Sequence, residues 1–374
     1  MKQVAIILGF LVCVLYACRD RYEPMVISSN NSYLVVEGNI QAGDGETTVR
    51  LTRTFKLDDS AQLKTEDQAT MRIEDENNGQ YPLTWVGDGY YKSGNLNLPV
   101  NQSYRLRIMT GGQEYVSDYV LAKETPPIDS VNWTQEGETI RIFVNAHDPS
   151  GNTRYYRWNY EETWEIRSYY FALYIYENGA IRPRDLATEN VATCWKYHNS
   201  NSIFLANSTR QNEDIIHEMP LLLIPPRDEK LQVRYSVLVK QYALDKESYN
   251  FYDLMKKTSE DIGSLFSAQP FELRGNIRNV NDAADYVIGQ ITASTVTEKR
   301  IFIEIPGWRF TQDCPSYELP NNKDSIEYYF GPTGFLDVFD YTGPPPASNK
   351  YRGAFPQCVD CQVRGGNTNR PSYW

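Results

Sequence analysis

The stretch YYRWNYEETWEI, residues 155–166, decides the fold class of this chain. Apolar residues occupy alternate positions, and polar or charged residues stand between them. Since successive side chains of a strand point to opposite faces, this pattern predicts one long, half-buried β-strand. Its apolar face would consist of Tyr156, Trp158, Tyr160, Trp164 and Ile166. An aromatic stripe can also stack on sugars or nucleobases, but in a chain with 28 tyrosines we interpret this one as the core of a sheet.

The same alternation recurs on both sides of this strand, in YLVVEGNI (33–40) and LQVRYSVLVKQYAL (231–244). The runs around Asn77-Asn78-Gly79 and Gly111-Gly112 predict hairpins, because Asn and Gly accept the positive φ of a tight turn. The Pro-Pro stretch ETPPIDSV (124–131) predicts a link between two units. We therefore predict a mainly β protein with two tandem antiparallel β-sandwiches of the immunoglobulin or fibronectin-III-like kind, over residues 33–123 and 124–305.

Two segments depart from the strand pattern. Residues 246–266 predict a helix inserted in the second sandwich, with Asp245 as its N-cap. Its apolar side chains recur every three or four residues: Phe251, Met255, Ile262, Leu265 and Phe266. Residues 306–374 are rich in Gly, Pro and Asn and show little periodicity. We predict that they form an irregular tail that packs on the second sandwich and is stapled there by disulfides.

The first residues predict an export signal. Residues 1–17 contain an apolar run that is shorter than the roughly 20 residues of a membrane span but typical of a signal peptide. Leu15-Tyr16-Ala17 before Cys18 resembles the bacterial lipobox, so Cys18 is predicted to carry a lipid anchor, followed by a tether over residues 18–32. The alternative is an ordinary signal peptide that contains a cysteine.

Net charge and histidine content limit the function classes. Lys2 is the only charged residue of the leader, so cleavage changes the counts from 37 basic and 48 acidic residues to 36 and 48, a net charge of −12. This charge argues against nucleic acid or anionic lipid as a partner. The chain has only three histidines, which leaves little material for metal or general-base chemistry.

Four cysteines remain in the body of the mature chain: Cys194, Cys314, Cys358 and Cys361. In an exported protein an even set predicts disulfides, and four cysteines allow three connectivities. Cys358 and Cys361 also form a CxxC motif, so zinc binding or redox activity is the alternative. A thioredoxin-like site has this motif at the start of a helix, whereas here Arg364, Gly365 and Gly366 follow, so we favour structural disulfides.

No catalytic signature is present. The chain lacks a GxSxG elbow, an HExxH motif, a P-loop and a GxGxxG motif that opens a helix. His147, His198 and His217 have no partner at metal-ligand spacing and are interpreted as surface or structural residues. We predict no catalytic residues, no metal and no cofactor.

Several segments, in order along nearly the whole mature chain, carry a resemblance to a known family. They are the lipobox cysteine, LVVEG, PPIDSV, YYRWNYEE, VRYSVLVKQYAL, QPFELRGNI, KRIFI and CVDCQVRGGNTNRPSYW. The chain resembles the Bacteroidota lipoproteins grouped as domain-of-unknown-function family 4249. Members are often encoded beside TonB-dependent receptors, so the resemblance implies a lipid-anchored accessory protein of the outer membrane. Surface-exported lipoproteins of this phylum often have an acidic run just after the cysteine. Here Arg19-Asp20-Arg21-Tyr22-Glu23 mixes acidic and basic residues. We expect the protein to face the cell surface.

Two functional hypotheses follow. The first is a non-enzymatic binding or assembly subunit of a TonB-dependent nutrient-import receptor, with an unknown ligand. The alternative is a cell-envelope enzyme, a hydrolase acting on glycan or peptide, with an unrecognised site. Arg370, Tyr373 and Trp374 have the composition of an interface core and are predicted to contact the partner. The alternative is that Tyr373 and Trp374 fill the core of the second domain.

Three serines match the Asp-Ser/Thr-aliphatic pattern that resembles the O-glycosylation sequon of exported proteins in this phylum. They are Ser60, Ser130 and Ser325. A glycan needs an exposed site. Ser130, beside the Pro-Pro link, and Ser325, in the tail, are predicted to be exposed enough for glycosylation. A three-residue pattern also arises by chance, which is the alternative.

Overall fold

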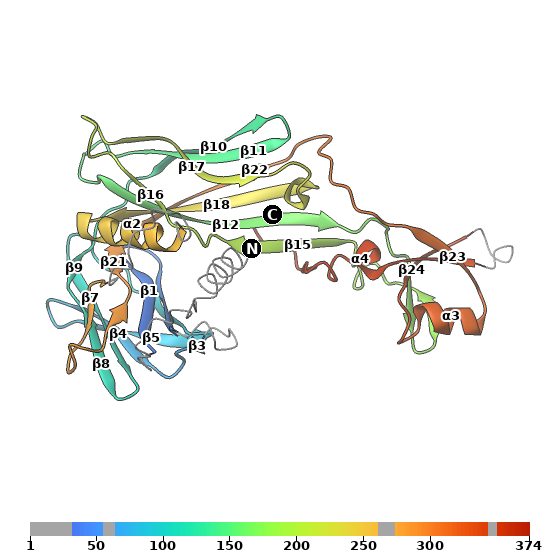
Figure 1. Cartoon of the computed structure of the whole chain (residues 1–374), viewed down its shortest axis with the longest axis horizontal. Helices are drawn as coiled ribbons and strands as arrows, with labels where there is room; N and C mark the ends of the chain where they lie inside the picture. Colours follow the sequence, from blue (N-terminus) through green and yellow to red (C-terminus); the bar gives the residue numbers. More distant parts are fainter. Residues whose placement is uncertain (1–31, 55–63, 261–273, 343–349) are drawn as a thin grey trace, which may run out of the picture.

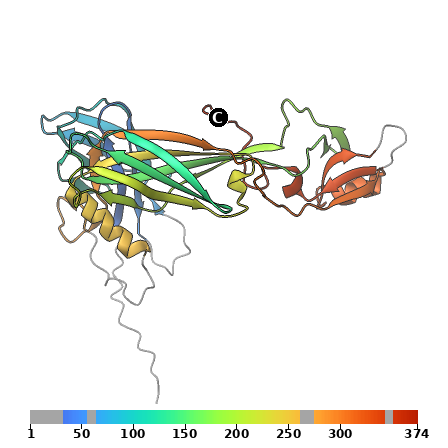
Figure 2. The same cartoon turned by 90° about the horizontal axis from the view of Figure 1, so that it is seen from above.

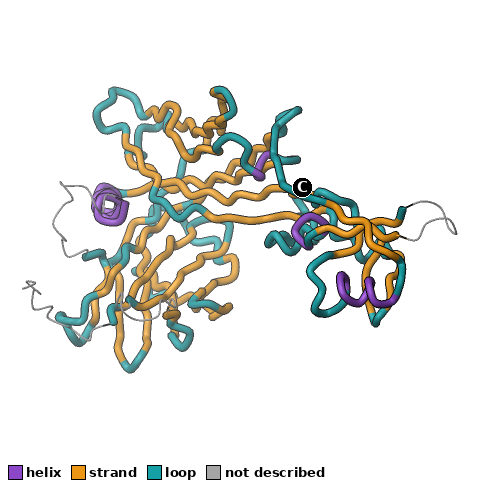
Figure 3. The backbone as a smooth tube through the Cα atoms, turned by 45° about the vertical axis from the view of Figure 1, so that its right-hand side comes forward, coloured by secondary structure: helices purple, strands orange, loops and turns teal. Residues whose placement is uncertain are grey.

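The computed structural model describes residues 32–54, 64–260, 274–342 and 350–374. They form two β-sandwiches and a smaller lobe at the far end of the second sandwich (Figures 1 and 2). Strands make up most of the backbone, and α2 lies at the side of the molecule where the two sandwiches meet (Figure 3). The predicted pair of β-sandwiches is confirmed. No helix in the described ranges is long and apolar enough to cross a membrane.

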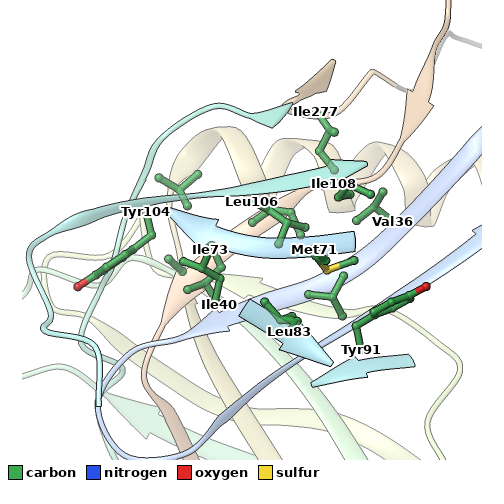
Figure 4. Close-up of a cluster of buried hydrophobic side chains, with 14 of the residues drawn as sticks. Val36, Ile40, Met71, Ile73, Leu83, Tyr91, Tyr104, Leu106, Ile108 and Ile277 are labelled. Carbon is green, nitrogen blue, oxygen red and sulfur yellow. The ribbon is translucent and has the colours of Figure 1, made fainter. Parts of the chain in front are cut away.

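In the first sandwich the strand pairing is continuous, so all its strands belong to one sheet. The order is β19-β8-β7-β4-β5-β6-β2-β1-β20; β3 pairs with β2, β9 with β7 and β21 with β1. Its strands from the N-terminal part are β1 (Leu34–Gln41), β2 (Glu46–Arg53), β3 (Lys64–Thr65), β4 (Thr70–Asp75), β5 (Gln80–Gly87), β6 (Tyr90–Asn95), β7 (Ser103–Thr110), β8 (Gln113–Ser117) and β9 (Val120–Leu121). Both predicted hairpins are present, and Asn78, Gly111 and Gly112 all have positive φ. Figure 4 shows the core, in which Met71 and Ile73 of β4 pack beside Leu106 and Ile108 of β7.

Residues 277–294 correct the predicted domain boundaries. They form β19 (Ile277–Asn279), β20 (Val287–Ile288) and β21 (Ile291–Ser294), which were assigned to the second sandwich but belong to the sheet of the first. β20 and β21 pair with β1 in parallel, so this sheet is not purely antiparallel. The physical reason is that they cover the edge of β1, whose backbone would otherwise lack partners. Gly289 permits this approach, because a Cβ there would meet the Val36 carbonyl oxygen at 2.2 Å.

The second sandwich packs a three-stranded sheet against a five-stranded sheet. The first contains β10 (Ile128–Glu136), β11 (Thr139–His147) and β17 (Ile215–Ile224); the second contains β15 (Thr193–Asn199), β12 (Tyr155–Arg167), β18 (Arg234–Leu244), β22 (Val296–Ile303) and β16 (Phe204–Asn207). A 3-10 helix, η1 (Glu229–Leu231), precedes β18. The aromatic face of β12 lies in this core, and Tyr156 and Trp158 are 0% exposed. The interpretation of this stripe as core is confirmed.

The predicted helix is α2 (Lys246–Glu260), between β18 and β19. Asp245 caps it as expected, because its Oδ1 accepts a hydrogen bond from the Ser248 backbone N–H at 2.6 Å. Phe251 and Tyr252 are buried against the second sandwich. Residues 261–266 of the prediction lie outside the described residues.

The tail is not irregular as predicted. Its residues form β23 (Ser316–Pro320), α3 (Lys323–Phe330), β24 (Asp337–Tyr341), β25 (Lys350–Ala354) and α4 (Pro356–Val359), with the sheet order β23-β25-β24. The hairpin β13 (Tyr174–Glu177) and β14 (Ala180–Pro183), inserted between β12 and β15, packs on it. Residues 168–192 and 312–359 together are called the distal lobe. It has its own apolar clusters, which explains why it stands apart from the second sandwich (Figure 1).

Glu74 holds β4 and β7 together through three arginines. Its carboxylate lies 2.8 Å from Nε of Arg72, 2.7 Å from Nη2 of Arg105 and 2.7 Å from Nε of Arg107. Burial alone raises the pKa of the Glu74 carboxyl, but the hydrogen bonds from the three guanidinium groups outweigh it and lower the pKa to about 2. The pKa of Glu74 is lower in the folded than in the unfolded state. The cluster therefore stabilises the fold at pH values above the unfolded-state pKa.

This depressed pKa predicts a specific acid sensitivity. The stabilisation from Glu74, about 3 kcal/mol, should be complete above the unfolded pKa of 4.5 and disappear as the pH falls through about 2. Urea unfolding of the wild type and Glu74→Gln between pH 7 and pH 2 measures it. The difference in free energy of unfolding between the two should be constant at neutral pH and shrink in acid. A difference that does not change with pH would contradict the assignment.

Candidate ligand-binding cleft

Two of the chain segments that run between the sandwiches are hydrogen-bonded to each other. The Thr125 backbone N–H donates to Oγ1 of Thr295 at 2.8 Å, and the Thr125 hydroxyl donates to the Thr295 carbonyl at 2.5 Å. Thr125 Oγ1 also accepts from the Ala243 backbone N–H at 3.0 Å, and Gln241 Nε2 donates to the Pro126 carbonyl at 2.8 Å. The two sandwiches are therefore joined by a hydrogen-bonded double crossing rather than by one free linker.

Helix α2 closes one end of this junction. The Tyr252 hydroxyl donates to the Gln290 carbonyl at 3.3 Å, and Gln290 Nε2 donates to the Ser248 hydroxyl at 3.1 Å. Gln290 links β20 to β21 in the first sandwich, while α2 packs on the second. The helix thus bridges the two sandwiches and fixes the walls of the space between them.

This space is a cleft of about 1050 Å³, which is at the upper end of the size typical of small-molecule sites. One wall comes from β1, β2 and β6, the other from β12, β18 and the loop of residues 199–203, and α2 closes the end. Apolar side chains such as Phe251, Met255 and Val296 line part of it, but most of the lining is polar: Asn39, Gln41, Thr48, Asn159, Asn199, Ser200, Asn201, Ser202 and Gln290 contribute amides and hydroxyls. A polar ligand is therefore favoured over an apolar one.

Arg157 is the central cation of the cleft. Its Cζ lies 4.6 Å from the ring centre of Tyr242, its cross-strand neighbour, and 4.6 Å from that of Tyr252 on α2. The guanidinium therefore makes cation–π contacts with two aromatic rings. Its Nε is buried without a hydrogen-bond partner, and no carboxylate of the described residues forms an ion pair with it.

Arg50 repeats this arrangement on the opposite wall. Its Cζ lies 4.8 Å from the ring centre of Tyr90, the residue opposite it on β6. Its Nε is likewise buried and unpaired, although Glu37 is opposite it on β1. The cleft therefore contains two half-buried guanidinium groups, each with a buried Nε that has no hydrogen-bond partner among the described residues.

Lys240, the third cation of the cleft, is already neutralised. Its Nζ lies 2.5 Å from Glu161 Oε1 and 3.5 Å from Glu298 Oε1. Burial lowers the pKa of the ammonium, but the hydrogen bond and charge of Glu161 outweigh it and raise the pKa above its ordinary value. Lys240 is therefore occupied by two carboxylates, and Arg157 and Arg50 remain the groups of the cleft that could bind an anion.

The group that most resembles a catalytic site lies at Glu162. Its carboxylate accepts hydrogen bonds from the Tyr235 hydroxyl and Lys230 Nζ at 2.7 Å and lies 2.8 Å from Nδ1 of His198. Burial, followed by the charge of Glu162, raises the pKa of Tyr235 well above its ordinary value. The carboxylate is fully occupied by these three partners, and we interpret the cluster as structural. Of the other histidines, His147 pairs with Asp129 at 2.7 Å on the surface.

All four body cysteines form disulfides, as predicted. The pairs are Cys194–Cys361 and Cys314–Cys358, with Cα–Cα distances of 5.8 and 5.7 Å. The two cysteines of the CxxC motif therefore bond to different partners rather than to each other. Within the described ranges, no group of three His, Cys, Asp or Glu side chains could hold a metal ion.

The predicted partner contacts at the C-terminus pack on the second sandwich. The Trp374 ring contacts Trp195 and Phe302, with ring centres 6.5 and 5.6 Å away. The Tyr373 hydroxyl hydrogen-bonds Oγ1 of Thr163 at 2.8 Å, and Arg370 Nη2 donates to the Trp374 carbonyl at 2.6 Å. The segment covers the outer face of the five-stranded sheet rather than filling the core between the sheets.

These contacts predict that the C-terminus stabilises the fold. Deleting residues 370–374 should lower the free energy of unfolding by about 2 kcal/mol, through lost aromatic packing and hydrogen bonds, and Tm by about 4–8 °C. Arg370→Ala, which leaves Trp374 in place, is the matched control and should change Tm little. An unchanged Tm of the truncated protein, measured by calorimetry, would instead favour the interface hypothesis.

The remaining predicted sites are distributed over the molecule. Cys18 and Ser60 lie outside the described residues. Ser130 is half-buried in β10, where its hydroxyl accepts hydrogen bonds from the side-chain amides of Asn132 and Asn145 at 3.1 and 3.0 Å. Ser325 lies in the first turn of α3 on the distal lobe. Glycosylation of these serines stays a prediction.

The comparison with protein families gives one match. The model of a family described as "Domain of unknown function (DUF4249)" matches residues 19–300, three quarters of the chain. The matched range contains the first sandwich and nearly all of the second, ends within β22, and leaves most of the distal lobe outside it. No curated protein matches the sequence.

Two solved structures are similar in part. One is a DUF4785 family protein from Legionella pneumophila, with 9% identity and a TM-score of 0.19. The match covers 56% of this chain and 52% of that protein, so the chain spans about half its length. A two-domain fibronectin type-III segment from chicken tenascin is covered to 92%, using 57% of this chain, with 9% identity and a TM-score of 0.17. At these scores, the assignment of the sandwiches rests on the sheet topology described above.

Proposed function

We propose, from the premise that this chain belongs to the family described as Domain of unknown function (DUF4249), that it is a non-enzymatic outer-membrane lipoprotein. Its role would be that of an accessory binding or assembly subunit of a TonB-dependent nutrient-import receptor. The lipobox-like sequence before Cys18 supports the anchor, and the order of family segments along the chain supports the receptor association. The enzyme alternative has no specific observation in its favour.

The exposed aromatic surface of the distal lobe carries this proposal. On α3, Tyr328 is 66% exposed, and near it Phe335 is 48% exposed. Both rings contact Tyr329, with ring centres 4.8 and 5.8 Å away. Further exposed side chains of the lobe are Tyr169, Phe171, Leu173, Leu186 and Tyr317. Exposed aromatic groups of this kind are typical of protein interfaces, since interface cores are enriched in Tyr and Phe.

The position of the lobe fits a partner that is not the lipid itself. The first described residue, Ser32, belongs to the first sandwich, whereas the lobe extends from the opposite end of the second (Figure 2). Thirteen residues lie between Cys18 and Ser32, and these fourteen steps along the chain span at most about 50 Å when fully extended. An anchored molecule could therefore present the lobe to a neighbouring receptor, with two or three acyl chains holding it stably in the membrane.

Photo-crosslinking in living cells tests this proposal. A benzoylphenylalanine residue in place of Tyr328 should yield one crosslinked product that contains the TonB-dependent receptor, identified by mass spectrometry. The matched control replaces Trp133, which is exposed on β10 of the second sandwich, away from the lobe. The control should give no such product.

The Cys18→Ala variant serves as a second control. Without the acyl chains it should leave the membrane fraction, and the crosslink from position 328 should weaken. If position 328, position 335 and position 169 all gave no receptor product, or if Trp133 gave the same product, the proposed contact would be wrong.

A further inference from the structure

We infer that the cleft between the two sandwiches binds a small polar ligand through a carboxylate group, which Arg157 receives. This site is separate from the distal lobe, and the inference does not depend on receptor association. Three features of the cleft support this ligand: the buried, unpartnered Nε of Arg157 and of Arg50, the aromatic rings beside each guanidinium, and the polar lining.

Arg157 is arranged to receive a carboxylate. Contact with the rings of Tyr242 and Tyr252 restrains its guanidinium, which leaves the edge of the group away from the rings for hydrogen bonds. A planar guanidinium presents parallel N–H donors that match the two oxygens of a carboxylate. Nε is a buried donor without an acceptor, so the guanidinium is partly desolvated, and a ligand carboxylate at its accessible edge would supply the missing counter-charge.

Arg50 extends the site to the opposite wall. It lies on β2 beside Tyr90, in the first sandwich, whereas Arg157 lies on β12 of the second, and both line the same cleft. A ligand held between them would contact both sandwiches at once. Because the double crossing and α2 fix the two walls, the site is largely formed before the ligand arrives, which reduces the entropy lost on binding.

The acidic residues of the cleft limit the charge of the ligand. Glu37, Asp44 and Glu46 are exposed on the wall of the first sandwich, so a polyanion would be repelled there. Side-chain amides of Asn159 and Asn199 and the phenol of Tyr242 offer hydrogen bonds to hydroxyl or amide groups. The expected ligand therefore has a carboxylate and several other groups that form hydrogen bonds. A sugar acid and a short peptide both have these features.

Isothermal titration calorimetry of the full mature chain in detergent tests this site. The probes are maltotrionate, which is maltotriose oxidised to carry a single carboxylate, trialanine, and the neutral maltotriose, each at millimolar concentration and at constant ionic strength. Maltotrionate or trialanine should bind to the wild type more tightly than maltotriose, and which of the two binds identifies the ligand source. Arg157→Gln should weaken that binding by at least about tenfold, and Arg157→Lys should also weaken it, because an ammonium lacks the planar fork.

Two further variants keep the result interpretable. Arg141→Gln is the matched control, because Arg141 is an exposed arginine on β11 that pairs with Glu136 outside the cleft. It should bind the probe as the wild type does. Arg50→Gln replaces Arg157→Gln if the latter fails to fold, and it too should weaken binding. The inference is overturned if neither carboxylate probe binds the wild type, if maltotriose binds equally well, or if folded Arg157 and Arg50 variants bind like the wild type.

Discussion

Replacing Cys194 and Cys361 by alanine is expected to lower the free energy of unfolding by up to about 5 kcal/mol. The disulfide closes a loop with a sequence separation of 167 residues, and constraint of the unfolded chain grows with loop length. Both sulfurs are also buried in the core of the second sandwich. The bond ties β15 to the segment that follows the distal lobe, so its loss should release the C-terminus as well.

Urea unfolding followed by tryptophan fluorescence measures this effect, since Trp158, Trp164 and Trp195 all lie in the second sandwich. The matched control removes Cys314 and Cys358, whose separation is 44 residues. That bond lies within the distal lobe, so the tryptophan-reported transition of the sandwich should move much less. An unfolding midpoint of the Cys194/Cys361 variant equal to that of the wild type would contradict the role of this disulfide.

Glu162→Ala is expected to destabilise the protein by about 3 kcal/mol or more. Glu162 is only 2% exposed, and its removal leaves the buried Tyr235 hydroxyl and the Lys230 ammonium without their acceptor. An unpaired buried charge or hydroxyl bears the full cost of its desolvation. Glu162→Gln should cost less, because an amide oxygen still accepts the Tyr235 hydrogen bond.

Glu161→Ala is the control for this variant, since Glu161 is the preceding residue of the same strand. It lies on the other face of β12, its side chain is 43% exposed, and it pairs with Lys240. Glu161 is itself exposed and Lys240 keeps Glu298 as a second partner, so the loss should cost no more than about 1 kcal/mol. Equal losses of stability from the two alanine variants, measured by urea unfolding, would show that Glu162 is not the buried anchor described here.

Local patterns were sufficient to predict the strands and turns. The alternation in residues 155–166 predicted β12 and its aromatic core face, and Asn78 and Gly111 marked turns that need positive φ. Asp245 predicted the start of α2 correctly. These features depend on a few neighbouring residues, which is why sequence alone reveals them. Glu162 is the exception within β12, because its burial depends on Lys230 and Tyr235 from distant parts of the chain.

The features that sequence reasoning missed are all non-local. β20 and β21 pair with β1 across some 250 residues of chain, and nothing in their composition indicates which sandwich they join. The distal lobe combines residues 168–192 with residues 312–359, so neither part alone contains a complete core. The cleft has the same origin: Arg157 lies among the polar positions of β12, and the contacts of its guanidinium with Tyr242 of β18 and Tyr252 of α2 depend on packing between distant segments.

The most direct test of the proposed accessory role is quantitative affinity purification of the Cys18-anchored protein from outer membranes. We predict that one TonB-dependent receptor co-purifies in a fixed molar ratio, and that Tyr328→Ser combined with Phe335→Ser abolishes this association while Trp133→Ser preserves it. Recovery of the protein without any receptor in fixed ratio, or recovery of the receptor unchanged by the two lobe substitutions, would contradict the account.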